Sequence, residues 1–177
     1  IELFHPVVTQ ITSMPKPVVA KVNGVAAGAG ASIALACDFV VAAETAHFTQ
    51  SFSKVGLSVD AGGGWHLTHA LGPARARAAL MLAETLDAGE AQALGLIYRA
   101  VPAEELDDAV DALLGKLSRT PRQALASIKT CVAAASSGQD FGEYLLSEAA
   151  AQGKAGRNPD YAEGVLSFLE KRKPDFG

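Results

Sequence analysis

The stretch KPVVAKVNGVAAGAGASIALACDFVVAA, residues 16–43, decides the fold of this chain. It begins with a short β-branched run, Val18 to Val22, followed by the pair Asn23-Gly24 and an apolar, glycine-rich segment that ends at Cys37. A second apolar run fills residues 38–43. β-branched residues favour strands, Asn-Gly favours a turn, and a segment that is apolar all round favours a buried helix. The stretch therefore predicts strand, glycine turn, buried helix and strand, the pattern of an α/β protein.

The same alternation extends on both sides of this stretch. Residues 1–14 predict an amphipathic helix, which the prolines at 15 and 17 end. Downstream we expect a short strand at 46–48, a loop at 53–60 and helices at 61–71 and 74–84. The capping box Asp87-Ala88-Gly89-Glu90 then begins a further helix, which ends at Gly95. A strand at 96–101 follows. Beyond Pro102 the pattern is helical only, at 103–118, 121–136, 139–153 and 159–172. The sequence predicts an α/β core over 1–101 and a helical region over 102–177.

Composition and charge exclude several classes of protein. The chain has 177 residues, of which 49% are hydrophobic and 19% charged, so it can bury a core and is not a disordered segment. Its 15 Lys and Arg against 19 Asp and Glu give a formal charge of −4, and no basic run is present, so nucleic acid is not expected as a partner. The longest apolar stretch, 25–36, is too short to span a bilayer, so no membrane is expected either.

The two cysteines indicate the redox environment of the chain. Cys37 and Cys131 lie far apart in apolar stretches, which argues against a disulfide framework or metal cluster and favours a reduced, cytoplasmic setting.

The sequence starts at Ile1 with a helical pattern already under way. We therefore expect the chain to begin inside a larger domain.

The glycine-rich segment from Gly24 to Gly30 is a candidate binding site. It follows a predicted strand and opens a helix, where free backbone N–H groups can bind a negatively charged oxygen. The spacing G-x-x-x-G-x-G is neither the dinucleotide fingerprint G-x-G-x-x-G nor a P-loop. Close packing of a helix on a sheet explains the same glycines, so the residues alone leave both interpretations open.

Among the carboxylates of the sequence, Asp60 is the strongest candidate for a catalytic group. It stands among Leu57, Val59 and Ala61 and directly precedes the glycines 62–64. Aspartate is a favoured N-cap, which gives a purely structural interpretation. A carboxylate among apolar side chains is also poorly solvated, which makes it a better base toward a carbon acid. The two roles are compatible.

Other polar residues carry weaker signals. The histidines lack Glu or Cys at ligand spacing, so no metal is expected, and the serines lack the G-x-S-x-G setting of a nucleophile. The residues concerned are His47, His66, His69, Ser32 and Ser51. The run Lys171-Arg172-Lys173 is typical of a solvated helix end and could also reach a phosphate.

Six collinear motifs together resemble the crotonase, or enoyl-CoA hydratase/isomerase, superfamily. They occupy residues 16–24, 27–30, 35–38, 61–63, 91–97 and 163–172, and so cover essentially the whole chain. The resemblance implies a spiral of strand-strand-helix turns followed by a helical trimerisation region, hence a homotrimer or a hexamer made of two trimers. It also implies an acyl-CoA thioester as substrate and no permanently bound cofactor.

The resemblance further implies a site for a thioester enolate. Family members hold the enolate oxygen with two backbone N–H groups, one of which maps onto Ala29, with Gly28 and Gly30 allowing close approach. Gly62 and Gly63 would also support the site. The second N–H group belongs to a segment upstream of the K-P-V motif, so the resemblance implies that the N-terminal third of the domain is absent.

The resemblance favours one branch of the family. Hydratases carry two glutamates that activate water, and the matching positions here are Ser32 and Phe52, so that pair cannot act. The segments around Leu57 and Asp60 resemble the branch of the ring-epoxide isomerase of phenylacetate breakdown and related enoyl-CoA isomerases, in which an aspartate matching Asp60 shuttles a proton. The sequence departs from that branch at Ser58-Val59 and Gly64. Ser32, Phe52 and Leu57 would line the pocket, and Lys171 and Lys173 would reach the CoA phosphates.

The sequence thus predicts an acyl-CoA isomerase that moves a double bond through an enolate, with Asp60 as the acid and base. Two alternatives stay open. One is a hydratase or another crotonase-type reaction, with groups from loop 51–59 or from outside the chain. The other is a non-catalytic fragment or structural subunit that trimerises through its C-terminal helices.

Overall fold

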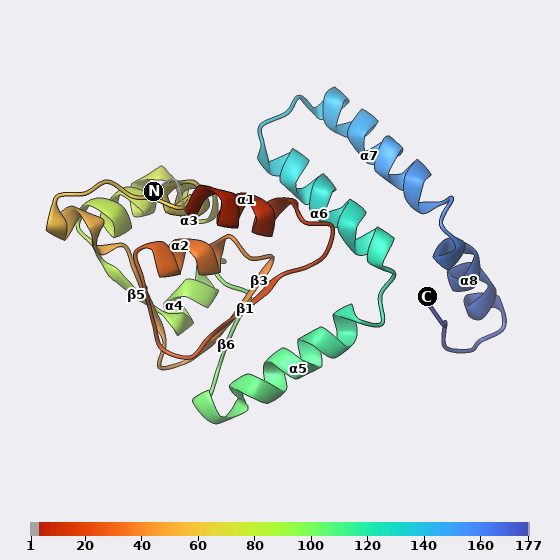
Figure 1. Cartoon of the computed structure of the whole chain (residues 1–177), viewed down its shortest axis with the longest axis horizontal. Helices are drawn as coiled ribbons and strands as arrows, with labels where there is room; N and C mark the ends of the chain where they lie inside the picture. Colours follow the sequence, from red (N-terminus) through yellow and green to blue (C-terminus); the bar gives the residue numbers. More distant parts are fainter. Residues whose placement is uncertain (1–3, 177) are drawn as a thin grey trace. The chain divides into compact units, whose positions relative to one another are not determined.

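The computed structural model describes residues 4–176, which form two compact units (Figure 1). The first contains the residues up to Ser13 together with Val18–Ala112, and the second contains Met14–Pro17 together with the residues from Leu113 onward. The division lies beyond the predicted boundary at 101/102. The reason is local, because Leu106 and Val110 are buried and Asp107 accepts a hydrogen bond from Lys21 Nζ at 2.6 Å.

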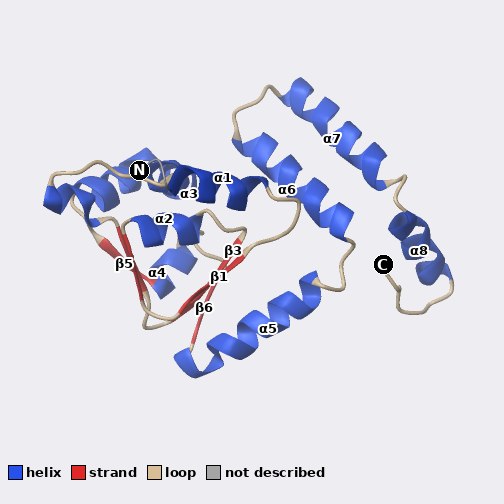
Figure 2. Cartoon of the chain, viewed as in Figure 1, coloured by secondary structure: helices blue, strands red, loops and turns tan. Residues whose placement is uncertain are grey.

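Two three-stranded sheets form the framework of the first unit (Figure 2). One has the order β1 (Val19–Val22), β3 (Phe39–Ala43), β6 (Arg99–Val101), all parallel. In the other, β2 (Val25–Ala27) is parallel to β4 (His47–Thr49), and β5 (Thr85–Asp87) is antiparallel to β4. Strands β1 to β4 alternate between the two sheets, as expected for a spiral of strand-strand-helix turns. The next strand, β5, joins the same sheet as β4, and β6 then returns to the first sheet after α4.

Helices connect these strands. They are α1 (Phe4–Ser13), α2 (Ala29–Leu35), the 3₁₀ turn η1 (Ser51–Val55), α3 (Gly63–Met81) and α4 (Ala88–Ala93). Helix α3 joins the two helices predicted at 61–71 and 74–84, but it is broken at Gly72, where φ is 73° and ψ is 166° just before Pro73. The predicted capping residue is confirmed, because an Asp87 carboxylate oxygen accepts from Glu90 N–H at 2.7 Å.

Two strands escape prediction from the sequence. Strand β2 lies inside the glycine-rich segment, where Val25 is too short a β-branched signal to separate a strand from the following helix. Strand β5 overlaps the capping box, so its three residues match a helix end equally well. Residues 1–3 of the predicted first helix lie outside the described part of the chain.

Small side chains dominate the core of the first unit. The residues at 1% exposure or less include Val41, Ala42, Ala46, Ala61, Ala88 and Ala91. Alanine lets backbones approach closely, so the two sheets and their helices pack at short range and a single added methyl group has little free space. This tight packing fixes the positions of the loops that follow β2 and β4.

The second unit is helical. It contains the end of α5 (Leu106–Leu117), then α6 (Arg122–Ser136), α7 (Phe141–Ala155) and α8 (Pro159–Leu169), close to the predicted ranges. Helices α6 and α7 pack side by side, and α8 is capped by Asn158, whose side chain accepts from Asp160 N–H. Among the described residues, no helix is both long enough and apolar enough to cross a membrane.

Candidate active site

The turn between β2 and α2 is shaped by Gly28. Its φ of 52° and ψ of −125° are values that L-residues avoid, and its N–H donates to the Thr49 carbonyl at 2.9 Å, at the carboxyl ends of the parallel strands β2 and β4. A Cβ at this position would also lie 3.3 Å from the Phe52 ring. The position therefore requires glycine for its backbone conformation, and the neighbouring ring leaves little room for a side chain.

Ala29 is the first residue of α2, so its N–H has no acceptor within the helix. The other end of the same peptide group is held, because the Gly28 carbonyl accepts from both Ser32 N–H at 3.0 Å and Ser32 Oγ–H at 3.2 Å. The C=O and N–H of a trans peptide point in opposite directions. Ser32 therefore fixes the direction in which the Ala29 N–H points.

The loop that carries Asp60 does not use its side chain as a helix cap. Ala61 and Gly62 both have positive φ, at 48° and 79°, and Gly62 is the N-cap residue of α3. The Asp60 carbonyl accepts from Gly63 N–H at 2.9 Å, whereas its Oδ1 is buried and accepts no hydrogen bond from any described residue. The capping interpretation of Asp60 is therefore wrong, because left-handed Gly62 begins the helix two residues later.

The Asp60 loop lies directly against α2 and the end of β4. A Cβ on Gly63 would overlap Ser32 Oγ and would lie 3.0 Å from Gln50 Nε2 and 3.1 Å from Val59 Cγ2. Two residues far apart in the sequence, Ser32 and Gly63, are thus in contact. Gly64 is similarly tight, since its Cβ would lie 3.2 Å from Val59 Cγ1.

Gln50 belongs to this cluster, although no sequence motif assigned it a role. Its side chain is 3% exposed, its Nε2 donates to Ser32 Oγ at 3.2 Å, and its buried Oε1 has no partner among the described residues. The available signal was its place directly after the apolar strand ending in Phe48-Thr49. A polar side chain there is carried into the core and needs a partner.

The other predicted site residues lie in different surroundings. Ser32 has no exposed surface, so within the described chain it lies beneath the site. Phe52 is half-buried against Gly28, and Leu57 is 63% exposed. A Cβ on Gly30 would meet no atom within 4 Å, so no described neighbour requires glycine there.

Aromatic side chains project from α3, and one of them, His66, lies beside the Asp60 loop. The His66 ring would be 3.5 Å from a Cβ on Gly62, and the Trp65 and His69 rings have centroids 4.1 Å apart. Burial, together with the nearby His69, lowers the pKa of His66 below its ordinary value. His66 is therefore neutral at physiological pH and covers the Asp60 loop without adding charge. Within residues 4–176, no three His, Cys, Asp or Glu side chains are arranged to hold a metal ion.

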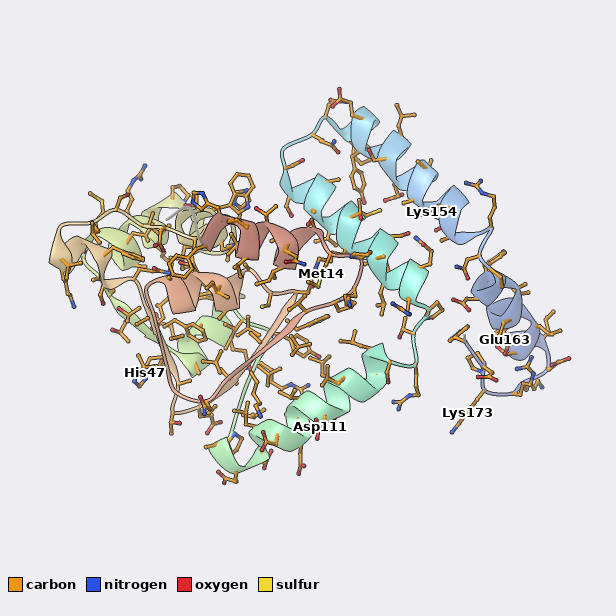
Figure 3. All side chains as sticks on the ribbon, viewed as in Figure 1. Met14, His47, Asp111, Lys154, Glu163 and Lys173 are labelled. Atoms are coloured by element: carbon orange, nitrogen blue, oxygen red, sulfur yellow. The ribbon has the colours of Figure 1, made fainter. Side chains whose placement is uncertain are left out.

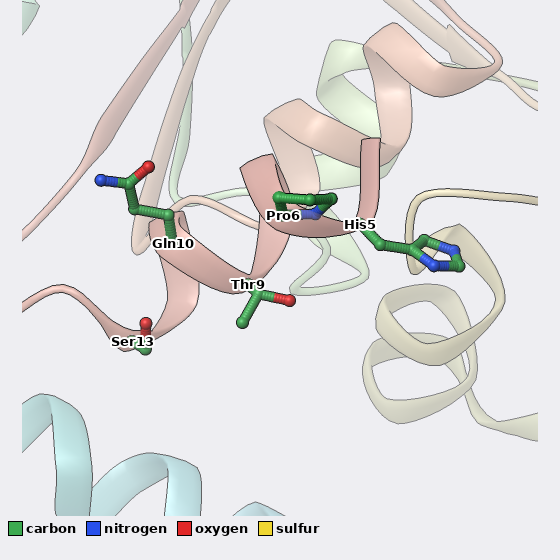
Figure 4. A pocket seen from close by; sticks show the side chains of 5 residues that line it. All are labelled: His5, Pro6, Thr9, Gln10 and Ser13. Carbon is green, nitrogen blue, oxygen red and sulfur yellow. The ribbon is translucent and has the colours of Figure 1, made fainter. Parts of the chain in front are cut away.

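Two hollows have linings that include neither Asp60 nor Ala29. One, of about 620 Å³, runs along α1 and is lined by His5, Pro6, Thr9, Gln10 and Ser13, whose side chains project from that helix (Figure 4). The other, of about 760 Å³, lies in the second unit among α6, α7 and α8, and its lining includes Tyr161, Phe168 and Phe176. The candidate site is therefore defined by the buried contacts around Gly28, Ser32 and Asp60.

Lys171 and Lys173 belong to the second unit, in the segment after α8. Lys173 is labelled in Figure 3. Their neighbour Arg172 donates to both carboxylate oxygens of Glu163, at 2.5 and 2.8 Å, and through Nε to Glu170 at 2.6 Å. Asp175 N–H also donates to Glu163, at 2.8 Å. This clamp folds the final segment back on α8. The contact of the two lysines with CoA phosphate stays a prediction.

The clamp predicts a pH dependence of stability. The hydrogen bonds from Arg172, and next from Asp175 N–H, lower the pKa of Glu163 from 4.5 to about 2. A lowered folded-state pKa stabilises the fold above the unfolded value, and that contribution is lost as the pH falls from about 4.5 toward 2. We expect the melting temperature of Glu163→Gln to lie below that of the wild type at pH 6 and to converge with it near pH 2. Exposed Glu104, changed to Gln, serves as the control and should show no such convergence.

Comparison with known proteins identifies the family. The family model described as enoyl-CoA hydratase/isomerase matches residues 2–177. The chain belongs to this family. A protein of Rhodobacter capsulatus named probable enoyl-CoA hydratase is 44% identical over 99% of this chain and 68% of its own length. The 1,2-epoxyphenylacetyl-CoA isomerase of Escherichia coli is 42% identical over 98% and 66%. The crystal structure of an enoyl-CoA hydratase from Polaromonas sp. JS666 superposes with a TM-score of 0.95 at 40% identity, covering 100% of this chain and 68% of that one.

These comparisons confirm the crotonase fold and leave two finer expectations without support. The relative named as a hydratase is slightly more similar than the one named as an isomerase, so a position nearest the ring-epoxide isomerase branch is not supported. The family match begins at residue 2, which gives no support to a missing N-terminal third. The chain spans about two thirds of the length of these enoyl-CoA hydratase/isomerase relatives.

Proposed function

We propose that the protein is an acyl-CoA isomerase that moves a carbon–carbon double bond, with Asp60 as the only acid and base. One observation carries this proposal. The Oδ1 atom of Asp60, in the loop that lies against α2, is buried and has no hydrogen-bond partner among the described residues. An unsatisfied buried carboxylate oxygen costs free energy, so it is expected at sites where the substrate supplies the missing partner. Family membership supplies the substrate class, an enoyl-CoA thioester.

The proposed reaction uses one carboxylate twice. Asp60 takes a proton from the carbon beside the thioester, and the electron pair of the broken C–H bond moves toward the thioester oxygen to give an enolate. The Ala29 N–H, fixed in direction by Ser32, donates to that oxygen, where the charge develops. Asp60 then returns the proton to the carbon two positions further along, and the double bond becomes conjugated with the thioester. No atom is gained or lost.

The same residues disfavour addition of water. At the two positions where the resemblance expects glutamates, Ser32 is fully buried and hydrogen-bonded, and the apolar ring of Phe52 covers Gly28. Neither side chain titrates, so neither can deprotonate a water molecule near neutral pH. A hydratase is the second candidate, because the relative named probable enoyl-CoA hydratase is 44% identical to this chain.

A paired turnover assay on the purified protein separates the two candidates. A β,γ-unsaturated acyl-CoA and an α,β-unsaturated one are offered separately, and the conjugated thioester is followed by its ultraviolet absorbance. We expect the first compound to be converted to its conjugated isomer and the second to remain unhydrated. Efficient hydration of the second compound would show that a water-activating group exists and would refute the roles assigned to Ser32 and Phe52.

We also propose that the protein self-associates as a homotrimer or a dimer of trimers through its second unit. Helices α6 and α7 bury none of their described side chains, and Ile128, Val132, Phe141 and Leu146 are each more than half exposed. Exposed apolar faces of this kind mark interaction surfaces. Sedimentation equilibrium should give three or six times the mass of the chain. A monomer at micromolar concentration would contradict the proposal.

A further inference from the structure

A buried chain of hydrogen bonds ends at the peptide group that presents Ala29 N–H. Gln50 Nε2 donates to Ser32 Oγ at 3.2 Å, and Ser32 Oγ donates to the Gly28 carbonyl at 3.2 Å. Ser32 is 0% and Gln50 3% exposed, so bulk water cannot compete for these bonds. The carbonyl can only accept, so Ser32 uses its single proton there and can only accept from Gln50. The donors therefore follow one direction, from Gln50 through Ser32 to Gly28.

We propose that Gln50 and Ser32 are positioning residues that orient and polarise the Ala29 N–H for the charge that develops on the thioester oxygen. This inference rests on the proposed function, because it assigns the Ala29 N–H to the enolate oxygen. Hydrogen bonds in a chain strengthen one another by polarisation in a low-dielectric interior. A donor on the carbonyl of a peptide makes the N–H of that peptide a stronger donor, so the effect of Gln50 reaches the substrate through two intervening groups.

The packing around the chain supports a role beyond stability. Gln50 Oε1 is buried without a partner among the described residues, so the side chain carries an unsatisfied acceptor that an apolar residue of similar length would avoid. The Gly63 backbone lies against both Ser32 Oγ and Gln50 Nε2. The pair therefore contacts the two elements that carry the proposed chemistry, the Gly28–Ala29 peptide and the Asp60 loop.

The direct test is the carbonyl stretch of a bound, unreactive thioester. The probe is a saturated butanoyl-CoA with ¹³C at the thioester carbonyl, and its infrared band is compared free and bound. In the wild type the band should move to lower wavenumber, because Ala29 N–H polarises the C=O bond. Ser32→Ala and, separately, Gln50→Met should each reverse part of that shift while the probe still binds. Ser53→Ala, an exposed serine in η1, is the control and should leave the shift unchanged.

Kinetics provide a second readout. We expect Ser32→Ala to lower kcat about tenfold with KM unchanged, less than the roughly 10²–10³-fold cost of deleting an oxyanion donor. Adding Gln50→Met to Ser32→Ala should cause no further loss, because Gln50 acts only through Ser32. In Gln50→Glu, only the protonated acid can donate to Ser32, so activity should fall as the pH rises through the titration of that new carboxyl group.

The outcomes separate this inference from the proposed function. A full wild-type carbonyl shift in both Ser32→Ala and Gln50→Met overturns the inference, even if Asp60 proves essential for turnover. The inference is also overturned if the losses of kcat caused by Ser32→Ala and Gln50→Met are additive in the double variant. If the wild-type protein itself does not isomerise the β,γ-unsaturated acyl-CoA, the proposed function is refuted instead. If Ser32→Ala fails to fold, the shift of the carbonyl band in Gln50→Met alone tests the inference.

Discussion

Asp60→Asn should lower kcat for isomerisation by about 10³-fold, within the range that a positioned general acid and base contributes. Asparagine has the size and shape of aspartate but cannot accept a proton, so the enolate does not form. The buried Oδ1 of Asp60 has no hydrogen-bond partner among the described residues, so no existing bond to that atom is broken by the change. The folded structure and the affinity for acyl-CoA should therefore remain.

The measurement for Asp60→Asn combines turnover with binding. Conversion of a β,γ-unsaturated acyl-CoA is followed at saturating substrate, and calorimetric titration with a saturated acyl-CoA gives the affinity. Asp108→Asn, an exposed carboxylate on α5, is the control and should behave as the wild type in both. Turnover within tenfold of the wild type in Asp60→Asn would remove Asp60 from its proposed role and direct attention to loop 51–59.

Local chemistry explains why much of the fold could be predicted from the sequence. The Asp87 cap, the break at Gly72-Pro73 and the buried strand Phe39–Ala43 each depend on a few adjacent residues, which the sequence displays directly. Strand β2 could not be predicted, because its three residues become a strand only by pairing with β4, which lies about twenty positions further along the chain. Pairing partners of this kind are not visible in a local pattern.

The candidate site divides in the same way. The importance of Gly28 follows from a glycine-rich turn after a strand, and its positive φ agrees with that expectation. The contact between Ser32 and Gly63 and the part played by Gln50 arise only when α2, β4 and α3 meet, so they required the folded chain. The capping interpretation of Asp60 failed for a related reason. Two consecutive residues with positive φ, Ala61 and Gly62, delay the start of the helix, and one of them is an alanine, which gives no warning.

Gly63→Ala should destabilise the fold, because the added methyl group has no space to occupy. It would overlap Ser32 Oγ and press on Gln50 Nε2 and Val59, all in a region without free volume. Overpacking of this kind costs about 1–3 kcal/mol, which for a chain of this size lowers the melting temperature by roughly 2–4 °C per kcal/mol. Isomerase activity should fall as well, because relief of the overlap moves the Asp60 loop away from α2.

Two companion variants distinguish this overlap from a general effect of replacing glycine. Gly30→Ala adds the same methyl group in α2, where no atom lies within 4 Å, and should not lower the melting temperature. Ser32→Ala removes the Oγ atom that the new methyl group meets, so the double variant Gly63→Ala/Ser32→Ala should recover part of the stability lost in Gly63→Ala. Strictly additive losses would show that the two residues do not press on each other. The assignment of the Asp60 loop to the face of α2 that carries Ser32 would then fail, and with it the geometry on which the proposed chemistry depends.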